Sequence, residues 1–424
     1  MSYYIIIAAS LIIIISYFFT LIEKKKSIPG VLMLISLGVI LQLFSAPLGL
    51  ENFDFSPILE ILGIVGLIMI VLEASLDLEL KRENLPLILK SFFLGLILLV
   101  LSTITFATIF ISLLKMEMVA ALLYAIPLSI ISSAIVIPSV EGLSKEKKEF
   151  MIYESAFSDI LGIMFFFLLI GSVHKETAGG VLLFIGGNIL FTLLISAIVC
   201  YGLILLFQKI KSETKLFLFI AILMIIYSVG KKLELSSLIM IMFFGMILKN
   251  PKLFFRGPLA RHLKPDVLSD IYKNFKVVTR ESAFVVRTFF FVIFGLSLVL
   301  SSLFSFQVLL ISMLLLIFLY GFRWLFTRIF LGKDMYPEAF ISPRGLITIL
   351  LFYAIPEEYL SAEFDEGILL FVILFTAVIM AVAMIRHSKK VEVEIPEALE
   401  TEINKELENG RSNLNDQSIE KDMK

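Results

Sequence analysis

Charged residues are scarce in this chain. They make up 17% of the 424 residues, whereas hydrophobic residues make up 59%, and the charges gather between long apolar runs. A soluble protein could not bury this much apolar surface. Apolar runs of about 20 residues cross a bilayer as helices, because a helix satisfies its own backbone hydrogen bonds in lipid. The sequence therefore predicts an all-α polytopic membrane protein.

Side chains that form disulfides or hold metal cofactors are equally few. Cys200 is the single cysteine, which excludes an intramolecular disulfide and most thiolate metal sites. His174, His262 and His387 fall in or beside polar loops, so we expect no buried histidine cluster that could hold zinc. We therefore expect no bound cofactor, and the net charge of −1 gives no indication of a nucleic-acid partner.

The motifs of membrane-embedded enzymes are absent as well. The chain has no Asp-rich loop, no His-Glu-x-x-His run and no paired aspartates in separate spans, which such proteases and prenyl transferases require. We predict that it is not an enzyme. The first residues, Met1-Ser2-Tyr3-Tyr4, lack the basic segment of a cleaved signal peptide, so the first apolar run is predicted to be a retained span.

The predicted architecture is one transmembrane domain, residues 1–387, with thirteen spans. Residues 388–424 are rich in Glu, Lys and Asn and poor in aromatics, which predicts a disordered tail. The predicted spans are 2–22, 29–46, 57–76, 86–114, 118–140, 150–171, 179–207, 215–230, 235–249, 281–302, 305–331, 336–356 and 364–387.

The distribution of Lys and Arg predicts the orientation. One set of alternate loops is basic, from Lys24-Lys25-Lys26 to Lys389-Lys390, whereas the other set carries the acidic segments 51–54 and 357–366. Lys231-Lys232 is the one discordant pair. Because basic loops stay in the cytoplasm, we predict an inner (plasma) membrane protein with its N-terminus outside and its C-terminus in the cytoplasm.

Two short self-similarities recur seven spans apart. Leu37-Gly38-Val39-Ile40-Leu41-Gln42 is similar to Phe244-Gly245-Met246-Ile247-Leu248-Lys249, and the run from Leu72 to Leu78 is similar to that from Phe294 to Leu300. An offset of seven spans gives the two copies opposite orientations, which is typical of transporters built from inverted repeats, here of six helices each. Chance similarity between Leu- and Ile-rich helices is the alternative.

The same offset pairs two spans whose helices are interrupted. The fifth contains Pro127, Ser132-Ser133 and Pro138, and the twelfth contains Ser342-Pro343-Arg344-Gly345. Interrupted spans at matched positions of two repeats indicate a transport site, because broken helices free backbone carbonyls and N–H groups near mid-membrane. The alternative is a pair of proline kinks without a function.

Asp159 is the residue hardest to explain without a function. It lies about nine residues into its span, so at 1.5 Å per residue it is roughly 14 Å deep in a hydrocarbon core about 30 Å thick. A carboxylate at that depth is costly and usually functional. Ser155 lies four residues earlier, on the same helix face. Asp159 is therefore the predicted binding group for a proton or a metal cation.

Three more charges are predicted in the same slab of the membrane. They are Glu154, Arg323 on the eleventh span at roughly 12 Å depth, and Arg344 on the twelfth. Because an unpaired buried charge is strongly disfavoured, we expect at least one carboxylate–arginine pair. Glu154 and Arg323 could instead snorkel to the cytoplasmic face, and Arg344 could cap carbonyls of the broken helix.

Other charges lie nearer the span ends. We expect structural roles for Glu73 and Asp77, and Arg287 has no predicted role. The basic stretch 250–280, with interleaved Phe and Leu, is predicted to lie along the lipid surface as an amphipathic connector.

At these residues the chain resembles the cation/proton antiporter superfamily, with the sodium/proton exchanger fold. Its Glu154-Ser155 and Ser158-Asp159-Ile160-Leu161-Gly162 resemble the Glu-Ser…Asn-Asp-Gly helix of that family. Three further matches are Val71–Asp77 to Phe-Glu-Gly/Ala-Gly-Leu, Phe289–Gly295 to Phe-Phe-Phe-x-x-x-Gly, and Pro343-Arg344-Gly345-Leu346 to Leu-Arg-Gly. The chain departs from the pattern at Ser158, where the family has Asn, and at Ser132-Ser133, where the electroneutral branch has Thr-Asp.

The resemblance, over essentially residues 1–387, implies a homodimer in the lipid bilayer. Each subunit would have a moving core of residues 86–171 and 305–387 and a scaffold of residues 1–76 and 179–302. The fifth and twelfth spans would cross as broken helices. Asp159 would bind the ion, Ser155 would contribute to the site, and Glu154 would pair with Arg323.

We therefore expect 1:1 exchange of a monovalent cation, Na⁺, K⁺ or Li⁺, for a proton by competition at Asp159. The hydroxyls of Ser132, Ser133, Ser155 and Ser158, with freed carbonyls, would complete an oxygen shell. Because only one carboxylate titrates, each cycle would move no net charge. The alternatives are a sodium-coupled organic anion symporter of the same fold and a passive channel.

Overall fold

Helices make up nearly all of the chain that the structure, a computed structural model, describes, and no strand occurs among those residues. The predicted tail, 388–424, and most of the predicted span 215–230 lie outside the described residues. The described residues are 2–26, 29–43, 56–80, 82–140, 142–172, 178–209, 237–255, 265–297 and 305–387, with a few single residues between 221 and 228 and residue 303.

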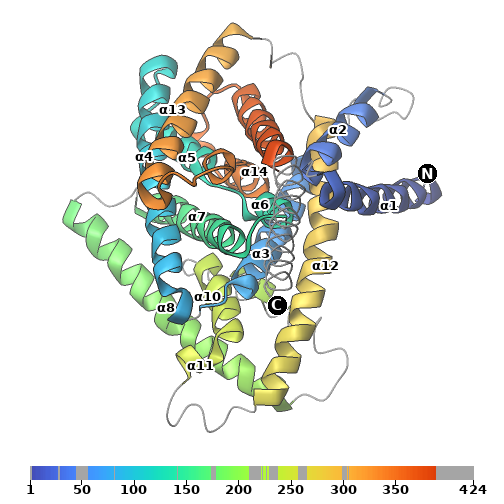
Figure 1. Ribbon diagram of the computed structural model, residues 1–424, viewed down its shortest axis with the longest axis vertical. Coiled ribbons are helices and arrows are strands. Elements are labelled where there is room, and N and C mark those ends of the chain that lie inside the picture. The colour runs from blue at the N-terminus through green and yellow to red at the C-terminus, as the bar shows by residue number, and fades with distance from the viewer. Residues whose placement is uncertain are drawn as a thin grey trace, which may run out of the picture.

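Most predicted spans correspond to helices (Figure 1). Six helices among the described residues are long and apolar enough to cross a membrane, and shorter apolar helices accompany them. The unbroken helices are α1 (Ser2–Lys26), α2 (Gly30–Leu43), α3 (Ser56–Asp77), α4 (Leu85–Leu114), α7 (Lys145–Ser172), α8 (Ala178–Lys209), α10 (Ser237–Lys249), α12 (Pro265–Ser297), α13 (Phe306–Leu331) and a last helix, Glu366–His387. Short helices are η1 (Arg82–Asn84), α11 (Pro251–Phe254) and η5 (Glu357–Tyr359).

The fifth and twelfth spans are broken, as predicted. The fifth consists of α5 (Met118–Ser129) and α6 (Ser133–Ser139), separated by extended backbone. The twelfth consists of η4 (Glu338–Phe340) and α14 (Leu346–Tyr353), with a non-helical stretch between them. Pro127 removes a helical hydrogen-bond donor just before the first break, and Pro343 disfavours helix for the residue before it.

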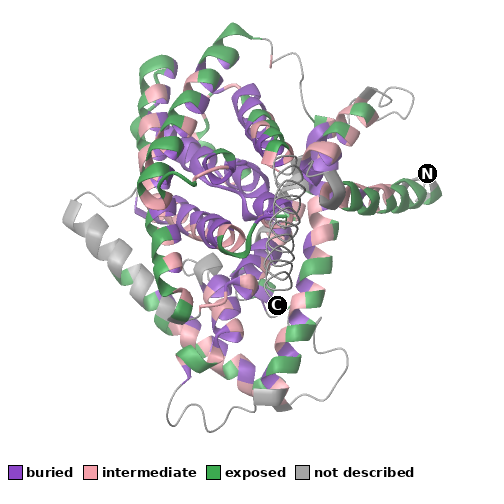
Figure 2. Cartoon of the chain, in the orientation of Figure 1, coloured by how far each residue is buried: buried purple, intermediate pink, exposed green. Residues whose placement is uncertain are grey.

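The helices pack in two groups. α12 packs against α2 and α3, α10 packs against α3 and α8, and α1 packs against α2 and α12; we call these helices the scaffold group. α4 packs against α5, α7 and α13, α5 and α6 pack against α7, and α14 packs against α5; we call these the core group. Figure 2 shows that α5, α6, α7 and α14 are mostly buried at the centre of the molecule, whereas α1 is largely exposed. The broken helices are thus shielded from lipid by other helices.

A close contact between α2 and α12 depends on two glycines. A Cβ added to Gly38 would lie 2.8 Å from the Cα of Gly295, and it would also collide with the carbonyl oxygen of Val292. Helix backbones can approach this closely in membranes only where small residues meet.

The contact between α10 and α3 has the same design, which supports the inverted repeat. A Cβ added to Gly245 would collide with the side chain of Ser75 and lie 3.2 Å from that of Leu72. Gly245 therefore matches Gly38, as the sequence similarity indicated. However, Leu72 occupies the place of Val292 and not that of Phe294, so the predicted alignment of α3 with α12 is wrong by two residues. The steric demand at the contact, rather than the Leu-rich pattern, sets this register.

α12 begins earlier than the predicted tenth span. The prediction started that span at residue 281, but the helix has 33 residues from Pro265 and is about 50 Å long, which exceeds the hydrocarbon core. Its first half is not a connector on the lipid surface. Ile271 and Phe275 are buried against the protein, and Lys276 forms an ion pair with Asp77 at the end of α3. These apolar residues recur at helical spacing because they face α3 and α10.

Gly38→Ala should destabilise the protein by about 1–3 kcal/mol, because the new methyl group forces α2 away from α12. The measurement is the midpoint of thermal unfolding in detergent micelles. Gly321→Ala on α13 is the matched control, because a Cβ there meets nothing within 4 Å and alanine favours a helix. Equal midpoints for the two variants would show that the α2–α12 contact tolerates a side chain.

Candidate functional site

The two broken spans cross at their non-helical stretches. The backbone N–H of Ser132 donates to the carbonyl oxygen of Pro343, with 2.9 Å between the atoms. Gly345 lies against the same residue, since a Cβ added to it would be 2.7 Å from Ser132 Oγ. A side chain at position 345 would therefore require the Ser132 hydroxyl and the end of the Ile135 side chain to move.

Asp159 faces this crossing from α7. It is 2% exposed, and its Oδ2 accepts a hydrogen bond from the backbone N–H of Ser133, the first residue of α6, at 3.1 Å. Its Oδ1 and the neighbouring Ser132 Oγ are both buried, and neither has a hydrogen-bond partner among the described residues. Unpartnered buried oxygens are rare in native proteins and call for an explanation, such as a bound ion or water.

Ser155 and Ser158 are buried on the same helix but have different contacts. Ser155 Oγ donates to the carbonyl of Met151 within α7, at 2.8 Å, so its lone pairs stay available to a cation. Ser158 Oγ accepts from the backbone N–H of Ile131 at 2.9 Å. Ser158 thus holds the broken segment in place, and it does so with a hydroxyl where the family pattern has an amide.

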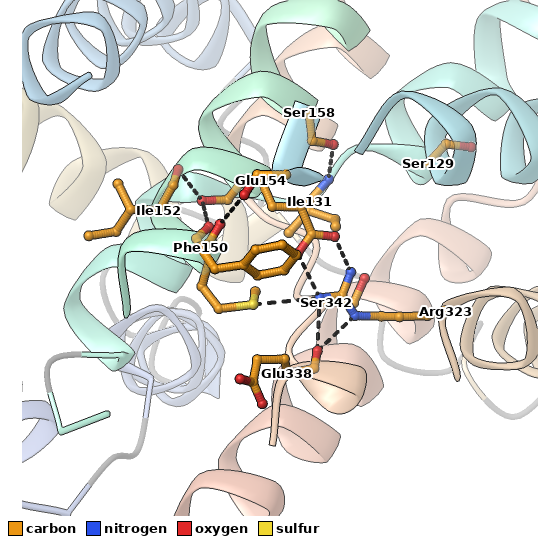
Figure 3. Close-up of polar contacts among 12 residues, drawn as sticks. Ser129, Ile131, Phe150, Ile152, Glu154, Ser158, Arg323, Glu338 and Ser342 are labelled. Atoms are coloured by element: carbon orange, nitrogen blue, oxygen red, sulfur yellow. Dashed lines mark hydrogen bonds and ion pairs between the residues drawn. The ribbon is translucent and has the colours of Figure 1, made fainter. Parts of the chain in front are cut away.

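Glu154 and Arg323 form a bidentate ion pair in the interior (Figure 3). The two bonds measure 2.7 and 3.1 Å, and both residues are at most 1% exposed. Arg323 also donates twice to the backbone carbonyl of Glu338, at 2.8 and 3.1 Å. Neither residue snorkels. The pair is neutral and its donors and acceptors are satisfied, as a buried ion pair requires.

Arg344 caps the end of α5. Its guanidinium donates to the carbonyls of Leu128 and Ser129, at 2.8 and 3.1 Å, and to the carbonyl of Ser342 at 2.7 Å. Helix ends leave carbonyls without partners, and a cation there opposes the negative end of the helix dipole. Of the two roles that the sequence left open for Arg344, the observed contacts are those of a cap.

A second hydroxyl, which the sequence analysis missed, matches Ser158. The backbone N–H of Arg344, two residues before α14, donates to Thr376 Oγ1 at 3.1 Å, just as Ile131, two residues before α6, donates to Ser158. The residue after Ser158 is Asp159, but the residue after Thr376 is Ala377. The second repeat therefore has no carboxylate at the equivalent position. The sequence analysis found no motif around Thr376.

Two cavities adjoin the crossing. A small pocket of about 10 Å³, lined by Arg323, Arg344 and four serines, has room for about one water molecule. A larger cavity of about 340 Å³ lies between α1, α3, α6 and α12, and Ser133 contributes to its wall. The larger cavity thus reaches the residue whose backbone holds Asp159.

Family comparison agrees with this geometry. The family model described as sodium/hydrogen exchanger, transmembrane, matches residues 7–386. The chain belongs to this family. This exchanger is therefore a multi-pass membrane transporter for cations and protons and not an enzyme, and it uses no cofactor because the transported ions are its substrates. The predicted family is confirmed.

The exchanger also has solved structural relatives. A structure of the sodium proton antiporter MjNhaP1 from Methanocaldococcus jannaschii at pH 8 has a TM-score of 0.65 and 19% identity, over 90% of this chain and 98% of that one. An electron-microscopy structure of MjNhaP1 has a TM-score of 0.64 and 18% identity, over 92% and 97% of the two chains. These likenesses confirm the predicted fold. No curated protein matches.

Arg323→Met should lower the stability of the exchanger by about 3–5 kcal/mol, because it leaves the Glu154 carboxylate buried without its partner. Adding Glu154→Gln should recover most of the loss in the thermal unfolding midpoint. Arg328→Met, at an exposed position of the same helix, is the control and should change stability by no more than about 0.5 kcal/mol. A double variant as unstable as Arg323→Met would mean that the charge itself is not the cause.

Proposed function

We propose that the exchanger moves one monovalent cation against one proton by competition at Asp159. The observation that carries the proposal is the buried Oδ1 of Asp159, which lacks a partner among the described residues although Oδ2 is held by Ser133. A buried carboxylate without compensation is strongly disfavoured, so it binds either a proton or a cation. Ser132 Oγ, also buried and unpartnered, is a second oxygen for a hard cation.

The 1:1 ratio follows from the other charges at the site. Glu154 and Arg323 neutralise each other, and Arg344 is occupied by the carbonyls at the end of α5. The second repeat offers Ala377 where the first offers Asp159. The single carboxylate of Asp159 therefore carries one cation in one direction and one proton in the other. Each cycle moves no net charge.

Transport further requires that the site open to the two sides in turn. We propose that the core, residues 86–171 and 305–387, moves against the scaffold, residues 1–76 and 179–302, because the two packing groups meet at the larger cavity. The exchanger would lie in the inner (plasma) membrane with its C-terminus in the cytoplasm, the side of the basic loops. It would act as a homodimer, as the family resemblance implies; its mass in detergent, from light scattering, tests this.

Asp159→Asn should abolish exchange, because a neutral amide cannot take up a proton or replace the carboxylate. The measurement is a pH-jump dye assay in everted vesicles, with Na⁺, K⁺ and Li⁺ added in turn to identify the cation. Asp270→Asn, at an exposed position of α12, is the control and should leave the rates unchanged. In the wild type, the apparent KM for the cation should rise as pH falls, because protons compete for the same oxygens. Exchange that survives in Asp159→Asn would disprove this assignment.

If exchange is electroneutral, its equilibrium should not depend on the membrane potential. In proteoliposomes with the potential clamped at several values, the equilibrium ratio of cation across the membrane should follow the proton gradient alone. A potential of 100 mV is worth about 2.3 kcal/mol per net charge moved, or nearly fiftyfold in that ratio. A ratio that tracks the potential would rule out the 1:1 stoichiometry.

A further inference from the structure

One hydroxyl in the second broken span is buried without a hydrogen bond. Thr348, the third residue of α14, is fully buried, and its Oγ1 has no partner in the part of the chain that the structure describes. A threonine inside a helix often donates to the carbonyl four residues earlier, as Thr108 and Thr376 do here. A buried polar atom that lacks such a bond calls for an explanation, such as a bound ion or water.

The hydrogen bonds at the two breaks fix which residues of the repeats are equivalent. Ile131 and Arg344 each donate a backbone N–H to a side-chain hydroxyl, and each lies two residues before the second half of its broken span. Four residues further along the chain, the first repeat has Ile135 and the second has Thr348. These two side chains therefore occupy equivalent positions.

Ile135 shows where a side chain at this position points. Its Cδ1 would lie 2.7 Å from a Cβ added to Gly345. Gly345 is the second repeat's equivalent of Ser132, by the register that the two N–H groups fix. Because inverted repeats are related by a pseudo-two-fold axis, Thr348 is directed at Ser132 in the same way. Threonine ends one atom earlier than isoleucine, so it leaves space between the two hydroxyls.

The packing of α14 gives an independent reason for this direction. Leu350 lies against the scaffold group, because its Cδ2 would be 2.9 Å from a Cβ added to Gly63 on α3. Thr348 lies two residues earlier, or about 200° around the helix, so it points away from α3. α14 also packs against α5 and α7. Thr348 therefore faces the core group, in which α7 carries Asp159.

The spacing at the crossing suits an ion between these oxygens. Thr348 lies three residues, or about 4.5 Å, along α14 from Gly345, and a Cβ added to Gly345 would be 2.7 Å from Ser132 Oγ. A hard cation that binds oxygens at about 2.3–2.6 Å can join two of them that are roughly 5 Å apart, which is beyond hydrogen-bond distance. Asp159 Oδ1 is likewise buried without a partner among the described residues.

We propose that Thr348 Oγ1 is a ligand of the transported cation, which it binds from the second repeat together with Asp159 and Ser132 from the first. A hydroxyl suits this role because it offers lone pairs to a hard cation and carries no charge. Thr348 thus raises the affinity for the cation without adding a second group that titrates. The inference rests on the proposed function, because the cation is the one that competes with a proton at Asp159.

Thr348→Val tests this role, because valine has the shape of threonine but no hydroxyl. Detergent-solubilised exchanger is titrated with LiCl, NaCl and KCl at constant pH, with choline chloride keeping the ionic strength constant, and the cation concentration at half-maximal thermal stabilisation is measured. For the cation that the wild type binds most tightly, Thr348→Val should raise this concentration on the order of tenfold, the loss expected for one contact between a hydroxyl and a charge. Without cation, its unfolding midpoint should not fall, because the removed hydroxyl had no hydrogen bond to lose.

Two further variants are controls. Thr348→Ser keeps the hydroxyl and should leave the half-maximal concentration within about twofold of the wild type. Thr103→Val removes another buried hydroxyl that has no partner among the described residues, and it should also have less than about a twofold effect. Thr103 lies on α4 eight residues, or about 12 Å, from Gly95, where an added Cβ would be 3.9 Å from the backbone nitrogen of Ser158.

Four results would overturn the proposal. They are a half-maximal concentration for Thr348→Val within about twofold of the wild type, a Thr348→Ser protein that binds as weakly as Thr348→Val, and an effect of Thr103→Val as large as that of Thr348→Val. The fourth is a Thr348→Val protein that unfolds at a lower temperature without cation, since the hydroxyl would then support the fold.

The same titration separates this inference from the antiport proposal. If cations stabilise the wild type but liposomes show no exchange, antiport is disproved, and the comparison of Thr348→Val with Thr348→Ser still decides whether Thr348 is a ligand. If exchange is measured but none of the three cations stabilises the wild type, the inference fails and antiport stands.

Discussion

The central constraint on this exchanger is that the backbone groups of two broken helices must find partners where no lipid molecule can supply them. The chain solves this with contacts to other segments, both between the two repeats and within the first. The N–H of Ser132 bonds to the carbonyl of Pro343, Arg344 covers the carbonyls at the end of α5, and Asp159 accepts the N–H of Ser133. The partners come from the broken stretch of the twelfth span and from α7, so the crossing requires both broken spans and α7 to pack together.

The two buried carboxylates at the centre differ in how many of their oxygens have a hydrogen-bond partner. The carboxylate of Glu154 has both oxygens bonded to Arg323, whose guanidinium is further held by the carbonyl of Glu338. Such a pair does not take part in ion exchange, because neutralising either residue would leave the charge of the other unpaired in the interior. Asp159 has one oxygen held and one buried without a partner among the described residues, and the proposal that it binds the exchanged ions rests on this difference.

The two repeats differ at the residues on which the proposed ion site depends. Both repeats use a hydroxyl, Ser158 or Thr376, to hold the N–H two residues before the second half of the broken helix. The next residue is ionisable only in the first repeat. The second repeat instead carries a charge at Arg344, whose side chain is hydrogen-bonded to backbone carbonyls at the end of α5 in the first repeat. The two halves thus share an architecture but differ in which residues carry a charge.

From the amino-acid sequence alone we predicted the membrane class, the broken spans and a buried carboxylate–arginine pair, and we singled out Asp159, whose ion-binding role is still a proposal. The reason is that lipid makes polar residues expensive, so a charge or proline inside a long apolar run is informative without any knowledge of its neighbours. Only the tertiary structure decided the partners of Arg344, the part played by Thr376, the extent of α12 and the register of the repeat. The partners of Arg344 and Thr376 are backbone groups of distant segments, and such groups leave no pattern along the chain. The same holds for Glu73 and Arg287, which are 214 residues apart in the sequence and become a pair only when α3 packs against α12.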